Sequence, residues 1–237
     1  MITEKILDQA IEAAEQGHLN GLVYDQSNWC GTACCVLGFA RHIAGLPPMN
    51  HAPQEDEIED TPRAQTIARL MSCPSPDILR VMRAVRPDGI IDLTGENLAG
   101  AKLAGADLTR AILTRVDFTE ANLAGADLGG ADLAAAELAG ADLTRAFLGW
   151  ANLTQANLAQ ANLTQANLTR ANLAQANLTQ ANLTGADFYR ADLTADFTGA
   201  YLNGADITGA NTVGSFVRIG NLKHKMIWSA YNVRGRR

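Results

Sequence analysis

The sequence predicts a solenoid, in which the chain coils around one interior, preceded by a small α-helical domain. Two observations predict it: an apolar residue recurs at every fifth position from Leu93 to Leu193, and helix signals are confined to the residues before 91. Positions five apart are rotated by about 140° in an α-helix and alternate between faces in a straight strand. Neither element would gather these leucines on one face, so the chain must turn a corner about once per five residues.

The repeat runs without interruption to Leu193, skips one residue in ADLTADFTGAYL and resumes at Phe197, for a total of about 25 copies. The residue two before each apolar centre is nearly always Ala, and the residue just before the centre is Asp or Asn. A small Ala suits a crowded interior near a corner, while the central residue fills the core. The predicted core of the repeats includes Leu98, Leu103, Phe118, Leu153, Phe188 and Phe197.

This A(D/N)LXX pattern resembles the pentapeptide-repeat family over about 120 residues. The resemblance implies a mainly β fold, a right-handed quadrilateral parallel β-helix with one pentapeptide on each side and four in each coil. At a strand spacing of about 4.8 Å, the coils would form a rod about 29 Å long. Residues twenty apart would then stack, which places Asp107, Asp127 and Phe147 in one column.

The charge distribution divides the chain into three predicted segments. Residues 1–90 carry 12 acidic and seven basic residues and are expected to form an α-helical domain that also caps the rod. Residues 91–213 carry 13 acidic and six basic residues and form the β-helix. Residues 214–237 carry six basic residues and no acidic one. This last segment is expected to act as a cap or as the interface of a homodimer, because solenoid ends expose apolar core and unpaired strand edges.

Capping residues predict three helices outside the cysteine segment described next, and a fourth within it that Thr32 caps and Gly45 ends. Thr3 is expected to cap a first helix that ends at Gly17, and Thr61 begins a second helix that buries Ile67. A third helix is expected between Ser75 as N-cap and Pro87 as the stop signal.

The segment NWCGTACCVLGFARHIAG holds Cys30, Cys34 and Cys35 and resembles parts of small helical domains in bacterial and phage proteins. Three interpretations stay open: buried core thiols, which the small apolar neighbours favour; a zinc site started by the C-x3-C spacing; and a nucleophilic Cys34 with a histidine base. All four cysteines lie before residue 74, unlike a disulfide framework. With no signal peptide and no apolar run of about 18 residues, we expect a reduced, cytoplasmic protein outside the membrane.

The repeats offer little chemistry. Residues 91–213 contain no His, Cys or Ser, so nucleophilic or imidazole catalysis cannot lie on the rod. The glycine-rich signature of calcium-binding β-helices is absent as well. We therefore expect no enzyme activity, no cofactor and no metal.

Outward positions supply the candidate binding surface. Phe147 and Trp150 break the polar rule, and Trp150 would lie one coil from Arg170, close enough for a cation–π contact. The Asn residues at outward positions from 152 to 182 are expected to form side-chain amide ladders in place of repelling acids. The candidate protein-binding residues are Asp107, Asp117, Asp127, Asp132, Asp142, Phe147 and Trp150.

The preferred function is a non-enzymatic scaffold that binds another protein. The alternative comes from the resemblance, since some family members are acidic rods that mimic duplex DNA and bind type II topoisomerases such as DNA gyrase. One charge per about 4 Å of rod is well below the charge per about 1.7 Å of B-DNA, so the likeness is partial. A thiol enzyme through Cys30 to Cys35 ranks lower, and the basic tail is not expected to bind nucleic acid directly.

Overall fold

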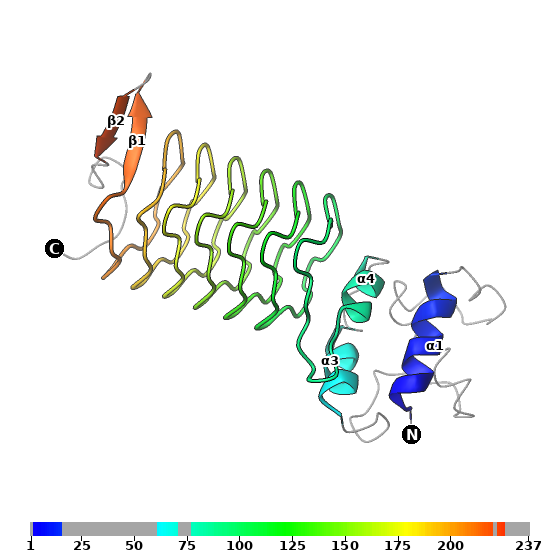
Figure 1. Cartoon of the computed structure of the whole chain (residues 1–237). Helices are drawn as coiled ribbons and strands as arrows, with labels where there is room; N and C mark the ends of the chain where they lie inside the picture. The colour runs from blue at the N-terminus through cyan, green and yellow to red at the C-terminus, as the bar shows by residue number, and fades with distance from the viewer. Residues whose placement is uncertain (1, 16–60, 71–76, 220–221, 226–237) are drawn as a thin grey trace. The chain divides into compact units, whose positions relative to one another are not determined.

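The computed structural model describes residues 2–15, 61–70, 77–219 and 222–225 (Figure 1). The chain divides into two compact units, Met1–Asp92 and Leu93–Arg237. The first unit contains α1 (Glu4–Glu15), α3 (Pro62–Leu70) and α4 (Ile78–Arg83). The second contains the coils of the rod, followed by β1 (Phe216–Ile219) and β2 (Leu222–Lys225).

The threonine caps predicted for the first two helices are present. The backbone N–H of Ile6 donates to the Thr3 hydroxyl at 3.4 Å, and that of Ala64 donates to the Thr61 hydroxyl at 3.2 Å. Each hydroxyl satisfies one of the amides that the first helical turn leaves unpaired. Gly17, the predicted end of the first helix, lies outside the described residues.

The first unit has a core of its own. Its large, fully buried side chains come from all three helices and from Ile2, two residues before α1. They are Ile2, Leu7, Ile11, Ile67, Leu70, Ile78, Val81 and Met82. The three cysteines at positions 30 to 35, and with them the thiol and zinc interpretations, lie outside the described residues.

Helix α4 is shorter than its sequence predicted. It ends at Arg83, four residues before Pro87, because the next residues leave the helix to pair with the chain that returns. Val85 forms an antiparallel bridge with Ile91, and the backbone N–H of Arg86 donates to the Ile90 carbonyl at 2.8 Å. The predicted cap Ser75 is not among the described residues.

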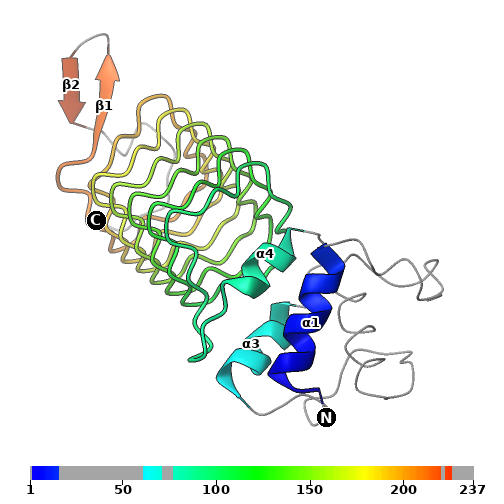
Figure 2. The same cartoon turned by 45° about the vertical axis from the view of Figure 1, so that its right-hand side comes forward.

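The rod is a stack of coils in which each residue of the Asp/Asn position bridges to the residue twenty positions on. Asp107 pairs in parallel with Asp127, Asp127 with Phe147, and Phe147 with Asn167. Each coil contributes four such bridges, one per side, and Figure 2 shows the resulting four-sided coils. This is the right-handed quadrilateral parallel β-helix that the sequence predicted, with sides so short that each is a single bridge rather than a long strand.

The corners repeat one backbone geometry. In each full repeat, the residue that follows the corner donates its backbone N–H to the backbone carbonyl of the apolar centre three residues earlier. Ala156, for example, donates to the Leu153 carbonyl at 3.0 Å. The last residue of the corner has a left-handed backbone, with φ of 61° at Gln155. Glycine adopts this conformation most readily, yet Gln and Arg occupy many corners, and whichever residue stands there its backbone N–H bonds the next coil. Gln155, for example, donates to the carbonyl of Ala174 at 2.9 Å.

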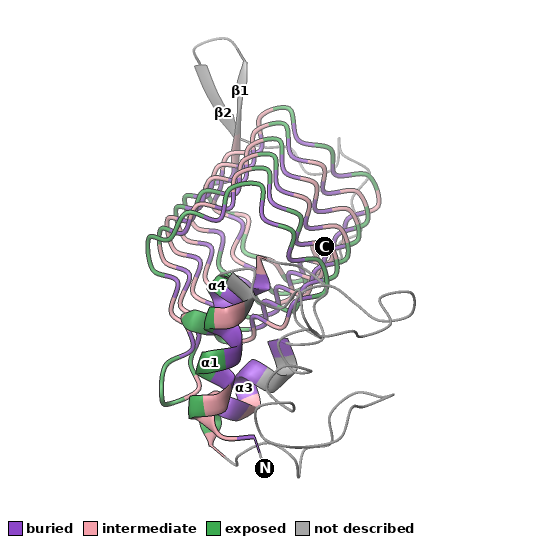
Figure 3. Ribbon diagram, turned by 90° about the vertical axis from the view of Figure 1, so that its right-hand side faces the viewer, coloured by how far each residue is buried: buried purple, intermediate pink, exposed green. Residues whose placement is uncertain are grey.

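The interior consists of two layers per side. The apolar centres and the alanines before them are buried along the rod, and Figure 3 shows this as buried residues that alternate with exposed corners. All six of the core residues predicted from the sequence are fully buried, with 0% exposure: Leu98, Leu103, Phe118, Leu153, Phe188 and Phe197. Close packing of one Leu and one Ala per repeat explains why these two positions vary so little along the chain.

The skipped residue between Leu193 and Phe197 is absorbed at one corner. The backbone N–H of Ala195 donates to the Leu193 carbonyl at 2.7 Å, so a tighter turn replaces the usual one. The buried hydroxyl of Ser215, in the following coil, donates to the same carbonyl at 2.6 Å. Bridges across this coil join residues 19 apart, such as Asn177 with Asp196, and the spacing of twenty returns at Phe216.

The last described elements form a hairpin. Strands β1 and β2 pair antiparallel, with Phe216 opposite Lys225 and Ile219 opposite Leu222. A dimer interface in residues 214–237 stays a prediction. The helices of the described part of the chain are too short and too polar to cross a membrane.

Candidate protein-binding surface

The structure distributes the seven candidate surface residues over all four sides of the rod. Asp107, Asp127, Phe147 and Trp150 share one side, because the first three occupy one stacked column and Trp150 is the corner that follows Phe147. The other three acids lie in separate columns. Asp117 stacks with Glu137, Asp132 with Asn152, and Asp142 with Asn162.

The side that holds Trp150 is called the aromatic side below. Phe147 lies on it in a space that two glycines provide. A Cβ atom at Gly149 would lie 2.6 Å from Phe147 Cζ, and one at Gly129 would lie 2.8 Å from Phe147 Cε1. The ring therefore lies against the backbone of two adjacent coils and is half-buried. The outward residues of the aromatic side are Asp107, Arg110, Asp127, Phe147, Trp150, Asn167, Arg170, Asp187, Tyr189 and Arg190.

Two cation–π pairs continue this side. Trp150 is 58% exposed, and Arg170 Cζ lies 5.7 Å from its ring centroid, which confirms the contact predicted from the twenty-residue stacking. Tyr189 is 37% exposed, with Arg190 Cζ at 5.0 Å from its ring. Each arginine holds its aromatic partner in place and keeps a positive charge beside it.

The three aspartates of the aromatic side each accept a hydrogen bond from the backbone two residues further along the chain. Asp107 accepts the backbone N–H of Thr109 at 3.0 Å, Asp127 that of Gly129 at 2.9 Å, and Asp187 that of Tyr189 at 2.8 Å. These Asx turns engage the carboxylates locally. The groups that project farthest at this edge are the corner side chains, which are Trp150 and three arginines.

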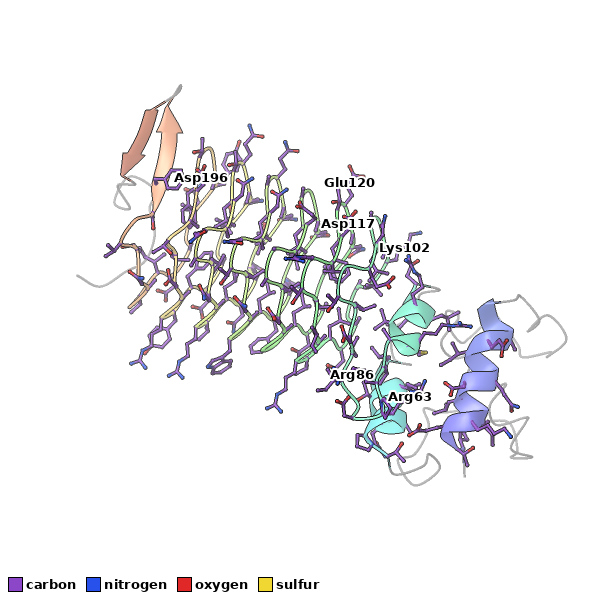
Figure 4. The ribbon with its side chains drawn as sticks, in the orientation of Figure 1. Arg63, Arg86, Lys102, Asp117, Glu120 and Asp196 are labelled. Atoms are coloured by element: carbon purple, nitrogen blue, oxygen red, sulfur yellow. The ribbon has the colours of Figure 1, made fainter. Side chains whose placement is uncertain are left out.

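A second side gathers negative charge and is called the acidic side below. Asp117, Glu120 and Glu137 lie on it in adjacent coils, and Asp196 lies farther along the same side (Figure 4). Between residues 97 and 199 no lysine or arginine occupies an outward position of this side. Thr119 donates two hydrogen bonds to the Asp117 carboxylate, one from its hydroxyl and one from its backbone N–H. Both bonds hold the pKa of Asp117 below its usual value, and the bond from the hydroxyl has the larger effect.

The predicted amide ladder is present in one column of the rod, where side-chain bonds join Glu137, Asn157 and Asn177. Asn157 Nδ2 donates to Glu137 at 2.7 Å, and Asn177 Nδ2 donates to Asn157 Oδ1 at 3.1 Å. Asn152 Nδ2 donates to Asp132 in the same manner at 2.9 Å. The amides of Asn152 and Asn157 thus donate to the carboxylates one coil before them, where a second carboxylate would be repelled.

Sequence reasoning missed Glu120, Glu137 and Tyr189 as surface residues. Their signal is the twenty-residue spacing: Glu137 follows Asp117 by twenty, and Tyr189 stands beside Arg190 in the corner that stacks on Arg170. Among the described residues, no three His, Cys, Asp or Glu side chains are grouped to hold a metal ion.

A stacked, four-sided solenoid with outward faces of repeated polar residues defines a class of repeat proteins. The family described as Pentapeptide repeats (8 copies) matches this chain over residues 91–130, 121–160 and 156–194. The chain belongs to the pentapeptide-repeat family.

Similar solved structures include two that are described as pentapeptide repeat proteins. The protein alr5209 from Nostoc Pcc 7120 is 30% identical, with 55% of this chain and 84% of that chain covered and a TM-score of 0.20. Rfr23 from the cyanobacterium Cyanothece 51142 is 25% identical, with 66% and 94% covered and a TM-score of 0.36. QnrB1, a plasmid-mediated fluoroquinolone resistance protein, is 15% identical, with 62% and 92% covered and a TM-score of 0.22. No curated protein matches the chain in sequence.

Proposed function

We propose that this protein is a non-enzymatic scaffold whose rod binds another protein through the aromatic side. The observation that carries the proposal is the exposed Trp150, which is 58% accessible and sits beside the half-buried ring of Phe147. Every other corner of the described rod carries Gly, Ala, Gln, Glu or Arg. Exposed Trp and Tyr side chains are enriched among the anchors of protein interfaces.

The geometry favours binding with little ordering cost. Backbone hydrogen bonds fix each coil to its neighbours, and Phe147 is wedged over two glycines. A partner would therefore meet a preformed surface, which reduces the entropy lost on association. Because Arg110, Arg170 and Arg190 share the corner row with Trp150, the partner that fits has an apolar recess bordered by acidic side chains.

Affinity capture from cells that naturally express the protein tests this proposal. The parent chain is compared with a Trp150→Gln, Tyr189→Thr double variant, and the captured proteins are quantified by mass spectrometry. We expect at least one protein that the parent enriches and that the double variant loses by tenfold or more.

A matched control is available on two other corners. A Gln155→Ala, Gln180→Ala double variant also removes two exposed corner side chains, and we expect it to capture the same proteins as the parent. If the aromatic variant and the parent enrich the same proteins to the same extent, the aromatic side is not the binding surface.

The acidic side supports a second candidate function, a DNA mimic that binds a type II topoisomerase. Asp117, Glu120 and Glu137 place three negative charges within adjacent coils without an outward base among them. Charge without compensating bases is the property that attracts a surface built for DNA phosphates.

The test is DNA gyrase supercoiling with the parent and with an Asp117→Asn, Glu120→Gln, Glu137→Gln variant. The mimic requires inhibition by the parent that the variant loses, whereas an Asp107→Asn, Asp127→Asn variant on the aromatic side inhibits as the parent does. Absence of any effect of the parent on gyrase would exclude this candidate and leave the scaffold untouched.

A further inference from the structure

The missing corner residue between Thr194 and Ala195 leaves a notch in the rod. Stacked corners at this edge carry Gly95, Arg115, Ala135, Gln155 and Gln175, and the next corner side chain in the column would come from the absent residue. The column resumes only at Gly214, which has no side chain. Beyond Gln175, the described residues therefore supply no corner side chain at two consecutive levels, and the small Thr194 side chain lies at the first of them, 3.9 Å from where a Cβ atom of residue 214 would be.

A surface cavity of about 800 Å³ coincides with this gap. Its volume lies within the range of small-ligand sites, about 300–1,000 Å³. It extends from the shortened corner onto the adjoining acidic side. The residues that line it are Ala174, Gln175, Ala176, Asn177, Thr179, Thr194, Asp196, Thr198, Gly214 and Phe216.

The chemistry of this lining selects among ligand classes. Among these described residues Asp196 alone is charged, and no lysine, arginine or histidine is present to attract a phosphate or a carboxylate. Two carboxamides and three threonine hydroxyls supply both donors and acceptors. Phe216, half-buried at the start of β1, supplies an aromatic surface. This combination suits a neutral ligand with many hydroxyl groups and one apolar face.

Hydrogen bonds within the lining orient its polar atoms. The Thr179 hydroxyl donates to Asn177 Oδ1 at 2.5 Å, which leaves the hydroxyl oxygen as an acceptor. The Thr198 hydroxyl and backbone N–H both donate to Asp196 Oδ1, at 2.5 and 3.0 Å. One coil before the lining, Gln155 Nε2 donates to Gln175 Oε1 at 3.1 Å, which engages the amide oxygen of Gln175 and leaves its N–H₂ group as the donor.

We propose that this notch is a binding site for a neutral sugar, with the carboxamides of Gln175 and Asn177 and the threonine hydroxyls bonding its hydroxyl groups and Phe216 packing against its C–H face. The site is independent of the aromatic side, because its lining belongs to a different corner and a different side of the rod. The shortened corner then has a role: it removes the side chain that would otherwise fill the site.

Saturation-transfer NMR on the full chain tests the proposal, with a panel of neutral methyl hexosides and methyl cellobioside as probes and the methyl glycosides of the matching uronic acids as anionic counterparts. We expect transfer to at least one neutral glycoside and at least tenfold weaker binding of its uronic acid counterpart. Stronger binding of the disaccharide than of the monosaccharides would identify a polysaccharide as the source, and equal binding would identify a free sugar.

Three variants decide whether the notch is responsible. Phe216→Ala removes the aromatic wall, and a glutamine inserted between Thr194 and Ala195 restores the twenty-residue coil and fills the gap with a corner side chain like that of Gln175; each is expected to weaken binding tenfold or more. Gln180→Ala, on the neighbouring corner outside the lining, is the control and should bind as the parent does. Failure of every neutral glycoside to bind at 10 mM, or undiminished binding by the insertion variant with an unchanged melting temperature, would overturn the proposal.

Discussion

At the scale of single residues, the position within the five-residue repeat decides what a side chain does. Phe147 occupies the position that Asp127 and Asn167 hold in the coils before and after it, yet it lies flat instead of forming an Asx turn. Gly129 and Gly149 make this possible, since a Cβ atom at either would lie within 2.8 Å of the ring. The place of the Phe147 ring thus depends on a glycine in its own repeat and on another in the repeat one coil before.

A Gly149→Ala substitution tests this dependence. The added Cβ would meet the Phe147 ring at 2.6 Å, so we expect the free energy of unfolding in urea to fall by about 1–3 kcal/mol. In a Phe147→Asn background the same substitution should cost less than about 0.5 kcal/mol, because no ring is there to be displaced. An equal cost in both backgrounds would show that the ring and the glycine are not coupled.

Asp117 gives the rod a dependence on pH. Bonds from the hydroxyl and backbone N–H of Thr119 lower its pKa in the folded state. A lowered folded pKa contributes stability that is present above the unfolded pKa, about 3.9, and is lost as the pH falls through the folded pKa. We expect Asp117→Asn to show a smaller loss of unfolding free energy than the parent between pH 5 and pH 2.5. Identical losses in urea titrations would contradict this.

At the scale of elements, side-chain ladders join successive coils. The acids at one end of the rod and the asparagines in its middle meet at Glu137 and Asn157, where an amide donates to a carboxylate. The donor cannot be replaced by a second acid without placing like charges at the bridge spacing.

Asn157→Asp is therefore expected to lower the unfolding free energy by about 1 kcal/mol, and 1 M salt should reduce this loss through screening. Asn182→Asp is the matched control, because it bridges Asn162 and Tyr201 and would face no acid. A cost at Asn182 equal to that at Asn157 would mean that the ladder charge is not responsible.

In the helical unit, Arg63 ties α3 to two other segments. Its guanidinium donates to Asp8 of α1 at 2.7 Å and to the Val85 carbonyl at 2.9 Å, and it lies 3.8 Å from Glu4. The side chain is 11% exposed, so its loss leaves a carbonyl without its donor. We expect Arg63→Met to lower the free energy of unfolding of this unit by about 1.5–3 kcal/mol, measured by the far-UV dichroism of its helices.

An Asp8→Asn variant is the control for this prediction, since it keeps an acceptor for the guanidinium at an exposed position. Its cost should stay below about 1 kcal/mol, as for other exposed ion pairs. A loss as large as that of Arg63→Met would place the effect in the ion pair rather than in the bond to Val85.

The elements also show how far the sequence reaches. The five-residue spacing predicted the buried leucines and the stacking of Trp150 on Arg170, because a solenoid converts distance along the chain into distance in space by one fixed step. It could not predict the early end of α4, which follows from the pairing of Val85 with Ile91 across a turn. Nor did the spacing reveal the notch. The sequence shows that one residue is missing, but the cavity is formed by side chains of the neighbouring coils, whose positions come only from the structure.

At the scale of the whole rod, the four sides carry different surfaces on one uniform core. Sequence reasoning grouped Asp117, Asp132 and Asp142 with Phe147 because they are close along the chain, whereas the coil sends each to a different side. Neighbours on one side are twenty residues apart, so residues that are close along the chain lie on different sides of the rod. A partner that binds one side would therefore contact only every fourth repeat of the sequence.

The central claim is that the aromatic side contacts a protein partner. Its most direct test is site-specific photocrosslinking in cells that naturally express the protein, with p-benzoylphenylalanine in place of Trp150 or Arg170, and in place of Gln155 or Gln160 at other corners. We expect a discrete crosslinked product from positions 150 and 170 and none from positions 155 and 160. Products of equal yield from all four positions, or products from positions 155 and 160 alone, would contradict it.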